Sequence, residues 1–288
     1  MNNTLSDHYE QVVRCADWLK ERFGRPPRVA IITGSSGPSS LEKHFSSFKN
    51  LKLAKPFPVP TTPGHDPSVT YGKIGEVEAI WFRGRVHFYE DPDDRYRPVV
   101  VARALALWGV QVCILTNAAG TLVGHNPGQI CVITDHDSGP MGHNPLHGDP
   151  RVMANFGARH PDMNQVYDAG LRELAINTWV ARDKGTNVIT IATYTMVPGP
   201  NFETPLEARN RTAQTQLLGM STVPEAMALH HMGVRVLAYS VVTNRIHTDH
   251  VKHKLTHEEV QDVVKGIDDC FADYLAEVVI EIAATLEQ

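Results

Sequence analysis

Two stretches of the sequence carry side chains suited to holding an anion. In RVHFYE (residues 85–90), Arg85, His87 and Tyr89 alternate, so an extended backbone would point all three to one face. Arginine and histidine are good donors to phosphate, and Glu90 could hold the imidazole of His87 in place. The alternative is a polar edge segment that binds nothing.

A glycine/serine loop, GSSGPSS at residues 34–40, lies between an apolar run and the helical-looking LEKHF. Backbone N–H groups in such a loop, helped by the helix dipole, can hold an anion. The spacing matches neither the dinucleotide nor the Walker fingerprint, so a plain turn is an equal alternative. In GMSTVPE (219–225), Ser221 or Thr222 could cap a helix with Pro224 in its first turn, or could bind an anion.

Other motifs suit a planar ring. TNAAG (116–120) follows a buried run, at the end of a strand where α/β sheets gather ligands, although a tight turn would look the same. In VPGPNFET (197–204), Phe202 offers a ring face and Glu203 an acceptor for a ring N–H, unless Glu203 only serves the next helix. Asn244 ends another apolar run. The histidines beyond it lack metal-site spacing, and we expect no metal.

Composition excludes several other classes of protein. The 288 residues include 27 Lys plus Arg against 32 Asp plus Glu, a net charge of −5 that argues against a nucleic-acid partner. No apolar run is long enough to cross a membrane, and the start lacks the pattern of a secretory leader. Three of the four cysteines lie in apolar runs without C-x-x-C spacing, which favours buried free thiols and a cytoplasmic protein.

The elements that must position these residues follow an α/β pattern. Continuous apolar runs predict strands buried on both faces, as in mostly parallel sheets, at 29–33, 77–82, 110–116, 129–134, 188–196 and 234–243. Helical spacing is found near the N-terminus (12–23) and at 97–108, 171–182, 205–218, 224–232 and 257–286. Without linkers or repeats, we expect one domain with elaborate loops.

Eight motifs follow one another along the chain: ITGSSG, TTPGHDP, GRVHFYE, TNAAGTL, GPNFETPLEAR, GMSTVPE, VVTN and THEEV. Together they resemble the trimeric purine nucleoside phosphorylase family, over about residues 10–285. The resemblance implies a single domain (1–288), α/β in class, with a central mixed β-sheet flanked by helices. It also implies a homotrimeric pentosyltransferase of purine salvage. Such an enzyme reversibly phosphorolyses 6-oxopurine (deoxy)ribonucleosides, with inorganic phosphate as co-substrate and no cofactor.

The resemblance also implies roles for particular residues. The expected phosphate site consists of Ser35, His65, Arg85, His87, Ala118 (through its backbone) and Ser221. The expected ribose site consists of Tyr89, Met220, His257 and, from the neighbouring subunit, His160. The expected purine site consists of Asn117, Phe202, Glu203, Leu218 and Asn244. Asn244, Glu203 and His87 would be catalytic, and Glu90 would orient His87.

Several positions depart from the family pattern. GSSGPS stands where the family has GSGLG, and Pro38 offers no N–H donor. Asp91, Asp93 and Asp94 add negative charge near the expected phosphate site, and His160 stands where many relatives have phenylalanine. Asn244, rather than the aspartate of the methylthioadenosine branch, favours 6-oxopurines. The rival interpretations are a non-catalytic nucleoside-binding protein, a nucleoside hydrolase and a nicotinamide dehydrogenase, which would need a glycine fingerprint.

Overall fold

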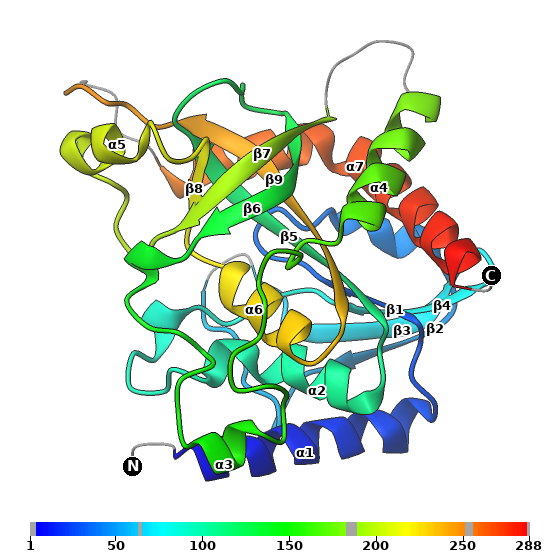
Figure 1. The fold of residues 1–288 in the computed structure, drawn as a ribbon. Coiled ribbons are helices and arrows are strands. Elements are labelled where there is room, and N and C mark those ends of the chain that lie inside the picture. The colour runs from blue at the N-terminus through cyan, green and yellow to red at the C-terminus, as the bar shows by residue number, and fades with distance from the viewer. Residues whose placement is uncertain (1–3, 63–64, 183–188, 251–255, 287–288) are drawn as a thin grey trace.

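A mixed nine-stranded β-sheet runs through the centre of the molecule (Figure 1). The structure is a computed structural model that describes residues 4–62, 65–182, 189–250 and 256–286. The strand order is β2-β3-β4-β1-β5-β8-β7-β6-β9. The strands are β1 Val29–Ile32, β2 Phe45–Lys52, β3 Ser68–Ile74, β4 Val77–Phe82, β5 Val112–Thr121, β6 Ile130–Asp137, β7 Ile189–Met196, β8 Leu217–Gly219 and β9 Arg235–Arg245.

Five of these strands close into a ring. β9 pairs in parallel with β5 as well as antiparallel with β6, so β5, β8, β7, β6 and β9 surround a common interior. The ladder between β5 and β9 slips by one residue between Ala119 and Gly120. Such a bulge bends the strand and re-aims its side chains, and here it lies within TNAAG.

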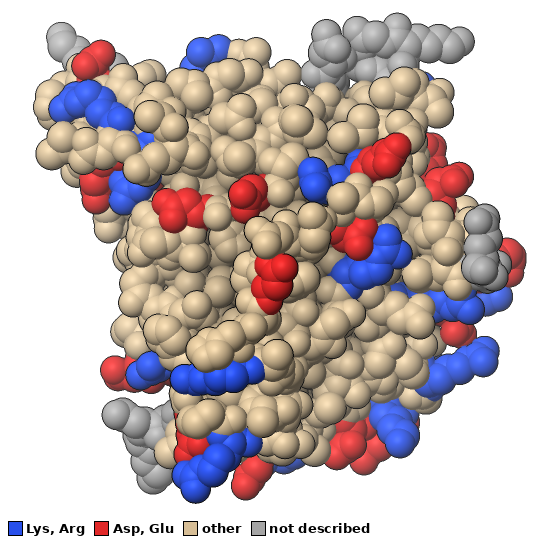
Figure 2. All heavy atoms as spheres, viewed as in Figure 1, with Lys and Arg blue, Asp and Glu red and all other residues tan. Residues whose placement is uncertain are grey.

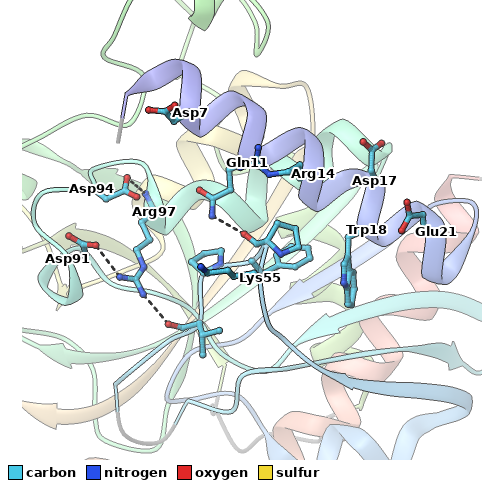
Figure 3. A pocket seen from close by; sticks show the side chains of 14 residues that line it. Asp7, Gln11, Arg14, Asp17, Trp18, Glu21, Lys55, Asp91, Asp94 and Arg97 are labelled. Atoms are coloured by element: carbon cyan, nitrogen blue, oxygen red, sulfur yellow. Dashed lines mark hydrogen bonds and ion pairs between the residues drawn. The ribbon is translucent and has the colours of Figure 1, made fainter. Parts of the chain in front are cut away.

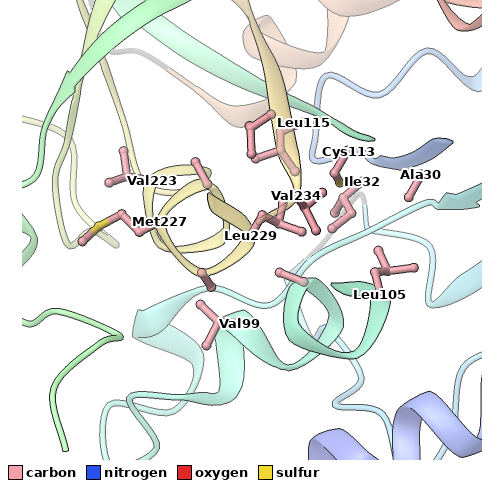
Figure 4. Packing of buried hydrophobic residues seen from close by; sticks show 14 of the residues in the cluster. Ala30, Ile32, Val99, Leu105, Cys113, Leu115, Val223, Met227, Leu229 and Val234 are labelled. Atoms are coloured by element: carbon pink, nitrogen blue, oxygen red, sulfur yellow. The ribbon is translucent and has the colours of Figure 1, made fainter. Parts of the chain in front are cut away.

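Helices cover both faces of the sheet, which explains the continuous apolar strands. Along β1, Ala30 and Ile32 pack beneath α1 (Leu5–Phe23), α2 (Val100–Trp108) and α6 (Val223–His231), as Figure 4 shows for α2 and α6. Val29 and Ile31 face the other way, toward α4 (Ala169–Arg182) and α7 (His257–Thr285). Alternate residues of one strand therefore belong to two separate cores.

Shorter helical pieces carry the loops. They are the 3₁₀ helices Ser39–His44, Phe88–Glu90, Arg97–Val99 and Gly139–Met141, with α3 Pro150–Met153 and α5 Pro205–Arg211. Thr4 caps α1 in a reciprocal capping box with Asp7, and Gly24 ends the helix at a φ of 81°.

The fold class and most predicted elements are confirmed: a single domain with a mixed sheet between helices. Three strands are missing from the sequence prediction, namely β2, β3 and β8. The helix predicted at 205–218 is wrong beyond Arg211, because residues 217–219 pair with β5 and β7. In LEKHF, residues 41–44 end a 3₁₀ helix instead of forming an α-helix and Phe45 begins β2, while residues 88–90 are 3₁₀ instead of extended.

TNAAG is also not a turn after a strand: it forms the last half of β5. Cys15, Cys113 and Cys131 are buried free thiols, whereas Cys270 is exposed. No helix in the described part of the chain is long and apolar enough to cross a bilayer. The face in Figure 2 intersperses both signs of charge and has no continuous basic stripe.

Candidate active site

One cavity of about 190 Å³ opens where β5, β8 and β9 meet the loops after residues 34, 86 and 196. Its wall contains Ser35, Thr62, His87, Tyr89, Asn117, Ala118, Ala119, Gly120, Pro200, Phe202, Glu203, Leu218, Gly219, Met220, Ser221, Thr243, Asn244, Ile246 and Val260. Most residues predicted for the phosphate, ribose and purine sites are therefore brought together. They come from segments more than 200 residues apart in the sequence.

The bulge between β5 and β9 gives the cavity its floor. Gly120 pairs with Asn244 across the two strands, and a Cβ on Gly120 would lie 2.6 Å from Ile246 and 3.0 Å from the Asn244 amide. A side chain at this position would therefore displace the Ile246 side chain and press on the Asn244 amide, so glycine suits the close approach of the two strands.

At one end of the cavity, Arg85 lies behind the wall rather than in it. Its side chain is 1% exposed, and Nη1 donates to the hydroxyls of Ser221 (3.1 Å) and Thr222 (3.0 Å). Nη2 donates to the Ile32 carbonyl at 3.1 Å, while Nε faces the Glu225 carboxylate at 3.2 Å. Burial raises the pKa of Glu225, and the charge of Arg85 opposes that rise.

This arrangement leaves the Ser221 hydroxyl with a free donor. Because its oxygen accepts from Arg85, its O–H can point into the cavity that Ser221 lines. The guanidinium thus polarises a hydroxyl that faces the cavity, without itself lining it.

His65 also lies behind the wall and fixes Ser35. Its Nδ1 accepts the backbone N–H of Arg85 at 3.0 Å, which leaves the proton on Nε2. Nε2 lies 3.0 Å from the Ser35 hydroxyl, so the imidazole donates to Ser35 and frees that hydroxyl to donate in turn. His65 and Arg85 thereby prepare two serine hydroxyls in the same way.

His87 is held by Glu90, as the sequence suggested. The carboxylate lies 3.1 Å from His87 Nδ1, and it also accepts the N–H and hydroxyl of Thr61 at 2.6 and 2.7 Å. Burial alone would raise the pKa of Glu90, but hydrogen bonds from His87 and Thr61 outweigh it and hold that pKa far below its usual value. An ionised Glu90 keeps Nδ1–H toward itself and turns Nε2 to the cavity.

The expectation for the glycine/serine loop needs correction. The first amides of its 3₁₀ helix are already used, because the N–H groups of Ser39 and Ser40 donate to the two carboxylate oxygens of Asp268 in α7, at 2.7 and 2.8 Å. A carboxylate at this helix start disfavours a second anion there. Only Ser35 of the loop lines the cavity. Gly37 is a turn residue that passes against Thr33, where a Cβ would lie 2.4 Å away.

The other end of the cavity carries an aromatic ring, a carboxyl and an amide. Phe202 is 49% exposed, and burial raises the pKa of Glu203 beside it. Glu203 does not cap the next helix: Thr204 caps α5 in a box with Glu207. The Thr243 hydroxyl lies 3.0 Å from Asn244 Oδ1 and 3.3 Å from the Ala119 carbonyl; the shorter bond, to Oδ1, directs the Nδ2 donor elsewhere.

The residues expected around a sugar are only partly described. Tyr89 stacks on His87 with ring centroids 4.9 Å apart, and Gly199 passes between Tyr89 and Met220 so closely that a Cβ would lie within 3 Å of both. His257 begins α7, but its side chain lies outside the described residues. His160 is exposed beside Arg159, Met163 and other residues of a separate groove, away from this cavity.

Sequence reasoning missed several wall residues, above all Thr62, Pro200, Thr243, Ile246 and Val260. Four of them lie next to a singled-out motif or within one, so the motifs were the available signal. Thr222 was considered only as a cap or anion ligand. It is the N-cap residue of α6, but its hydroxyl makes no capping bond and instead accepts from Arg85 and from Asn117 Nδ2 (2.9 Å).

A larger open groove runs between α1 and residues 55–59 and 91–97 (Figure 3). Several of its side chains already have partners: Arg97 pairs with Asp91 at 3.2 Å and donates to the Val59 carbonyl, and Gln11 donates to the Pro56 carbonyl. Asp91, predicted to oppose phosphate, is therefore neutralised by Arg97. Across the described residues, no cluster of three or more His, Cys, Asp or Glu could hold a metal ion.

The fold and cavity define an α/β protein whose cavity carries hydroxyl and imidazole groups at one end and an aromatic ring, a carboxyl and an amide at the other. The phosphorylase superfamily model matches residues 28–280. Purine nucleoside phosphorylase 1 of Bacillus subtilis is 36% identical over 263 residues, covering 90% of this chain and 93% of the relative. The Bos taurus purine nucleoside phosphorylase is 34% identical, covering 89% and 90%.

Solved structures agree with the sequence relatives. A Schistosoma purine nucleoside phosphorylase in complex with hypoxanthine superposes with a TM-score of 0.85 at 27% identity, covering 94% of this chain and 96% of that one. The Schistosoma mansoni enzyme with inosine gives 0.85 at 28% identity, with coverages of 94% and 95%. The chain therefore belongs to the phosphorylase superfamily and, within it, to the purine nucleoside phosphorylases, which are pentosyltransferases.

Proposed function

We propose that, as a purine nucleoside phosphorylase, this chain acts on 6-oxopurine nucleosides such as inosine and guanosine. Phosphate displaces the purine reversibly: the bond from the anomeric carbon to the purine nitrogen breaks, and a bond to a phosphate oxygen forms. The products are the free base and (deoxy)ribose 1-phosphate. The observation that carries this proposal is the pairing, in one cavity, of hydroxyl and imidazole donors at one end with Asn244 and Glu203 at the other.

At the phosphate end, Ser35, Ser221 and His87 would hold the dianion, together with the backbone N–H of Ala118. Support comes from the hydrogen bonds behind these residues. His65 and Arg85 donate to the Ser35 and Ser221 hydroxyls, so both serine protons remain available for the phosphate. The charge of Arg85 offsets that of the bound anion through the Ser221 hydroxyl. The phosphate in turn stabilises positive charge developing on the sugar.

At the purine end, the departing base gathers negative charge as the bond breaks. Asn244 would donate Nδ2–H toward N7 and the 6-oxo group, because Thr243 occupies its Oδ1. Glu203 would accept or share the ring N–H, with Phe202 and Leu218 on the ring faces and Asn117 between base and sugar. Donors aimed at developing charge are worth ~3 kcal/mol each by analogy with oxyanion-hole deletions.

The assembly we propose is a homotrimer in which His160 of one subunit completes the ribose site of the next, alongside Tyr89, Met220 and His257. It is supported by the place of His160 outside its own subunit's cavity. We further propose a cytoplasmic enzyme without a cofactor, consistent with four free cysteines. Sedimentation velocity should give three times the 31.9 kDa chain mass.

The test is cleavage of inosine by the purified protein with and without inorganic phosphate, with both products identified. Phosphate-dependent release of hypoxanthine and ribose 1-phosphate supports the proposal, whereas release of free ribose without phosphate makes the chain a hydrolase. Binding of inosine without any cleavage would leave a non-catalytic binding protein.

The preference for 6-oxopurines over adenosine can be tested with a substitution at Asn244. An aspartate at position 244 would present acceptors where the amide presents a donor, so Asn244→Asp should lower kcat/KM for inosine by about 100-fold and improve the adenosine-to-inosine ratio. An unchanged ratio would remove Asn244 from the specificity argument.

A further inference from the structure

We propose that Thr222 is a positioning residue whose buried hydroxyl holds both ends of the active site, the arginine behind the phosphate end and the amide beside the purine end. The inference rests on the proposed function, which assigns those two ends. Thr222 lies outside the cavity wall and is fully buried, so it acts through Arg85 and Asn117 and not by touching a substrate.

The hydroxyl is a shared acceptor. Arg85 Nη1 donates to it from one side at 3.0 Å, and Asn117 Nδ2 donates from the other at 2.9 Å. Asn117 Oδ1 is occupied in turn by the Ser240 hydroxyl at 2.8 Å. Both sides of the Asn117 amide are thus fixed, and a second Nδ2 proton stays available on a residue that lines the cavity.

The backbone at this residue is strained. Thr222 has a φ of 73° and a ψ of −48°, a conformation that a β-branched side chain rarely adopts. Helix capping does not explain it, because the hydroxyl makes no capping bond. In this backbone conformation the hydroxyl meets Arg85 Nη1 and Asn117 Nδ2 instead of the first turn of α6.

Loss of the hydroxyl should therefore disturb both substrates at once. Without it, one Nη1 proton of Arg85 and one Nδ2 proton of Asn117 lose their acceptor in a buried place. Each group would move to recover a bond, and each movement displaces a group next to a different substrate. Replacing a purely structural residue would change the free energy of unfolding without raising KM for both phosphate and nucleoside.

The experiment compares Thr222→Val, Thr222→Ser and Thr222→Gly in steady-state phosphorolysis of inosine. Valine keeps the shape and removes the hydroxyl; we expect KM for phosphate and KM for inosine each to rise about 10-fold or more. Serine keeps the hydroxyl and should stay within about 3-fold of wild type in both. Glycine relieves the positive φ, so it should fold at least as readily as valine and still show both KM increases.

Thr195→Val is the matched control, since Thr195 is equally buried and its hydroxyl has no hydrogen-bond partner among the described residues. It should leave both KM values unchanged. The inference is overturned if valine and glycine behave like the control, if only one KM moves, or if serine fails to rescue. A wild-type protein without phosphate-dependent cleavage would instead overturn the proposed function, so the two failures are distinguishable.

Discussion

Two arginines, Arg85 and Arg103, are buried among the described residues. Comparing them shows how a buried charge next to the active site differs from one that only stabilises the fold. Arg85 faces the carboxylate of Glu225 and donates to two hydroxyls, that of Ser221 in the cavity wall and that of Thr222 behind it. Arg103, in the middle of α2, is fully buried with no carboxylate within ion-pair distance in the described part of the chain. Burial alone therefore does not mark a site; the partners do.

The partners of Arg103 do not line the cavity, whereas Ser221, a partner of Arg85, does. Its Nη1 lies 2.7 Å from His8 Nε2, its Nη2 donates to the Pro145 carbonyl at 2.9 Å, and its guanidinium lies over the Phe156 ring, 4.1 Å from the centroid. Burial lowers the pKa of Arg103 to about 9. These contacts tie α1 and α2 to the segment 145–156, which leads to His160.

Replacing Arg85 should have the largest effect. In Arg85→Met the Ser221 hydroxyl loses its charged donor and the Glu225 carboxylate is left buried without a cation. We expect kcat/KM for phosphate to fall 100- to 1,000-fold and the free energy of unfolding to drop by about 3 kcal/mol. Steady-state kinetics and urea denaturation measure the two losses. Near-normal phosphate kinetics would assign the arginine a structural role like that of Arg103.

Removing the carboxylate as well should separate those losses. In the double variant Arg85→Met with Glu225→Leu, no charge is left buried, so stability should return to within about 1 kcal/mol of wild type. Activity should not return, because the Ser221 hydroxyl still lacks its donor. A double variant no more stable than Arg85→Met would show that Glu225 was not the cause of the instability.

Replacing Arg103 should affect stability and spare activity. Arg103→Met leaves no carboxylate behind, but it leaves the Pro145 carbonyl and His8 without their donor. We expect the free energy of unfolding to fall by about 1–3 kcal/mol and kcat/KM to stay within about 3-fold. A loss of activity as large as that of Arg85→Met would contradict the contrast and give the segment 145–156 a direct part in the site.

The sequence predicts the buried strands and the cavity-lining residues better than it predicts the hydrogen bonds that hold those residues in place. Six strands have continuous apolar runs that predict them. Of the other three, β2 (FSSFKNLK) is exposed along most of its length, β3 (SVTYGKI) is mostly buried but has polar and small residues between its apolar ones, and β8 has only three residues. Motifs at strand ends converge because the sheet brings those ends together. Their supporting partners come from far away: Asp268 takes the amides of the glycine/serine loop 229 residues along the chain. No local pattern encodes such a contact.

Arg103 and Thr222 show the same limit in single residues. VVARALALW predicts a helix with an arginine on it, but burial of that arginine depends on α1 and on Phe156. The sequence predicts that Ser221 or Thr222 caps a helix or binds an anion, because serine and threonine are preferred N-cap residues. A φ of 73° turns the Thr222 hydroxyl inward, and only tertiary structure imposes that angle.

The effect most specific to the surroundings of Arg103 is on the pH dependence of stability. Burial, with the charge of Arg103 beside it, lowers the pKa of His8 to about 2 in the folded protein, against 6.5 for a free imidazole. Between those values the unfolded chain binds a proton that the folded chain does not. The contribution of His8 is therefore complete above about pH 6.5 and is lost as the pH falls, at up to about 1.4 kcal/mol per pH unit.

His8→Phe tests this directly, because phenylalanine keeps a ring against Tyr96, whose ring centroid lies 5.0 Å from that of His8, but cannot take up a proton. The variant loses the acceptor for Arg103 and should be less stable than wild type at pH 7. Between pH 6 and pH 4, however, its free energy of unfolding in urea should fall less steeply than that of wild type, by up to about 1.4 kcal/mol per pH unit. The plots of stability against pH for the two proteins should therefore converge in acid. Other buried histidines, such as His136 and His231, have lowered pKa values and keep part of the slope in both proteins. Parallel curves would mean that His8 is already protonated beside Arg103, which a ring nitrogen accepting a hydrogen bond from a guanidinium does not allow.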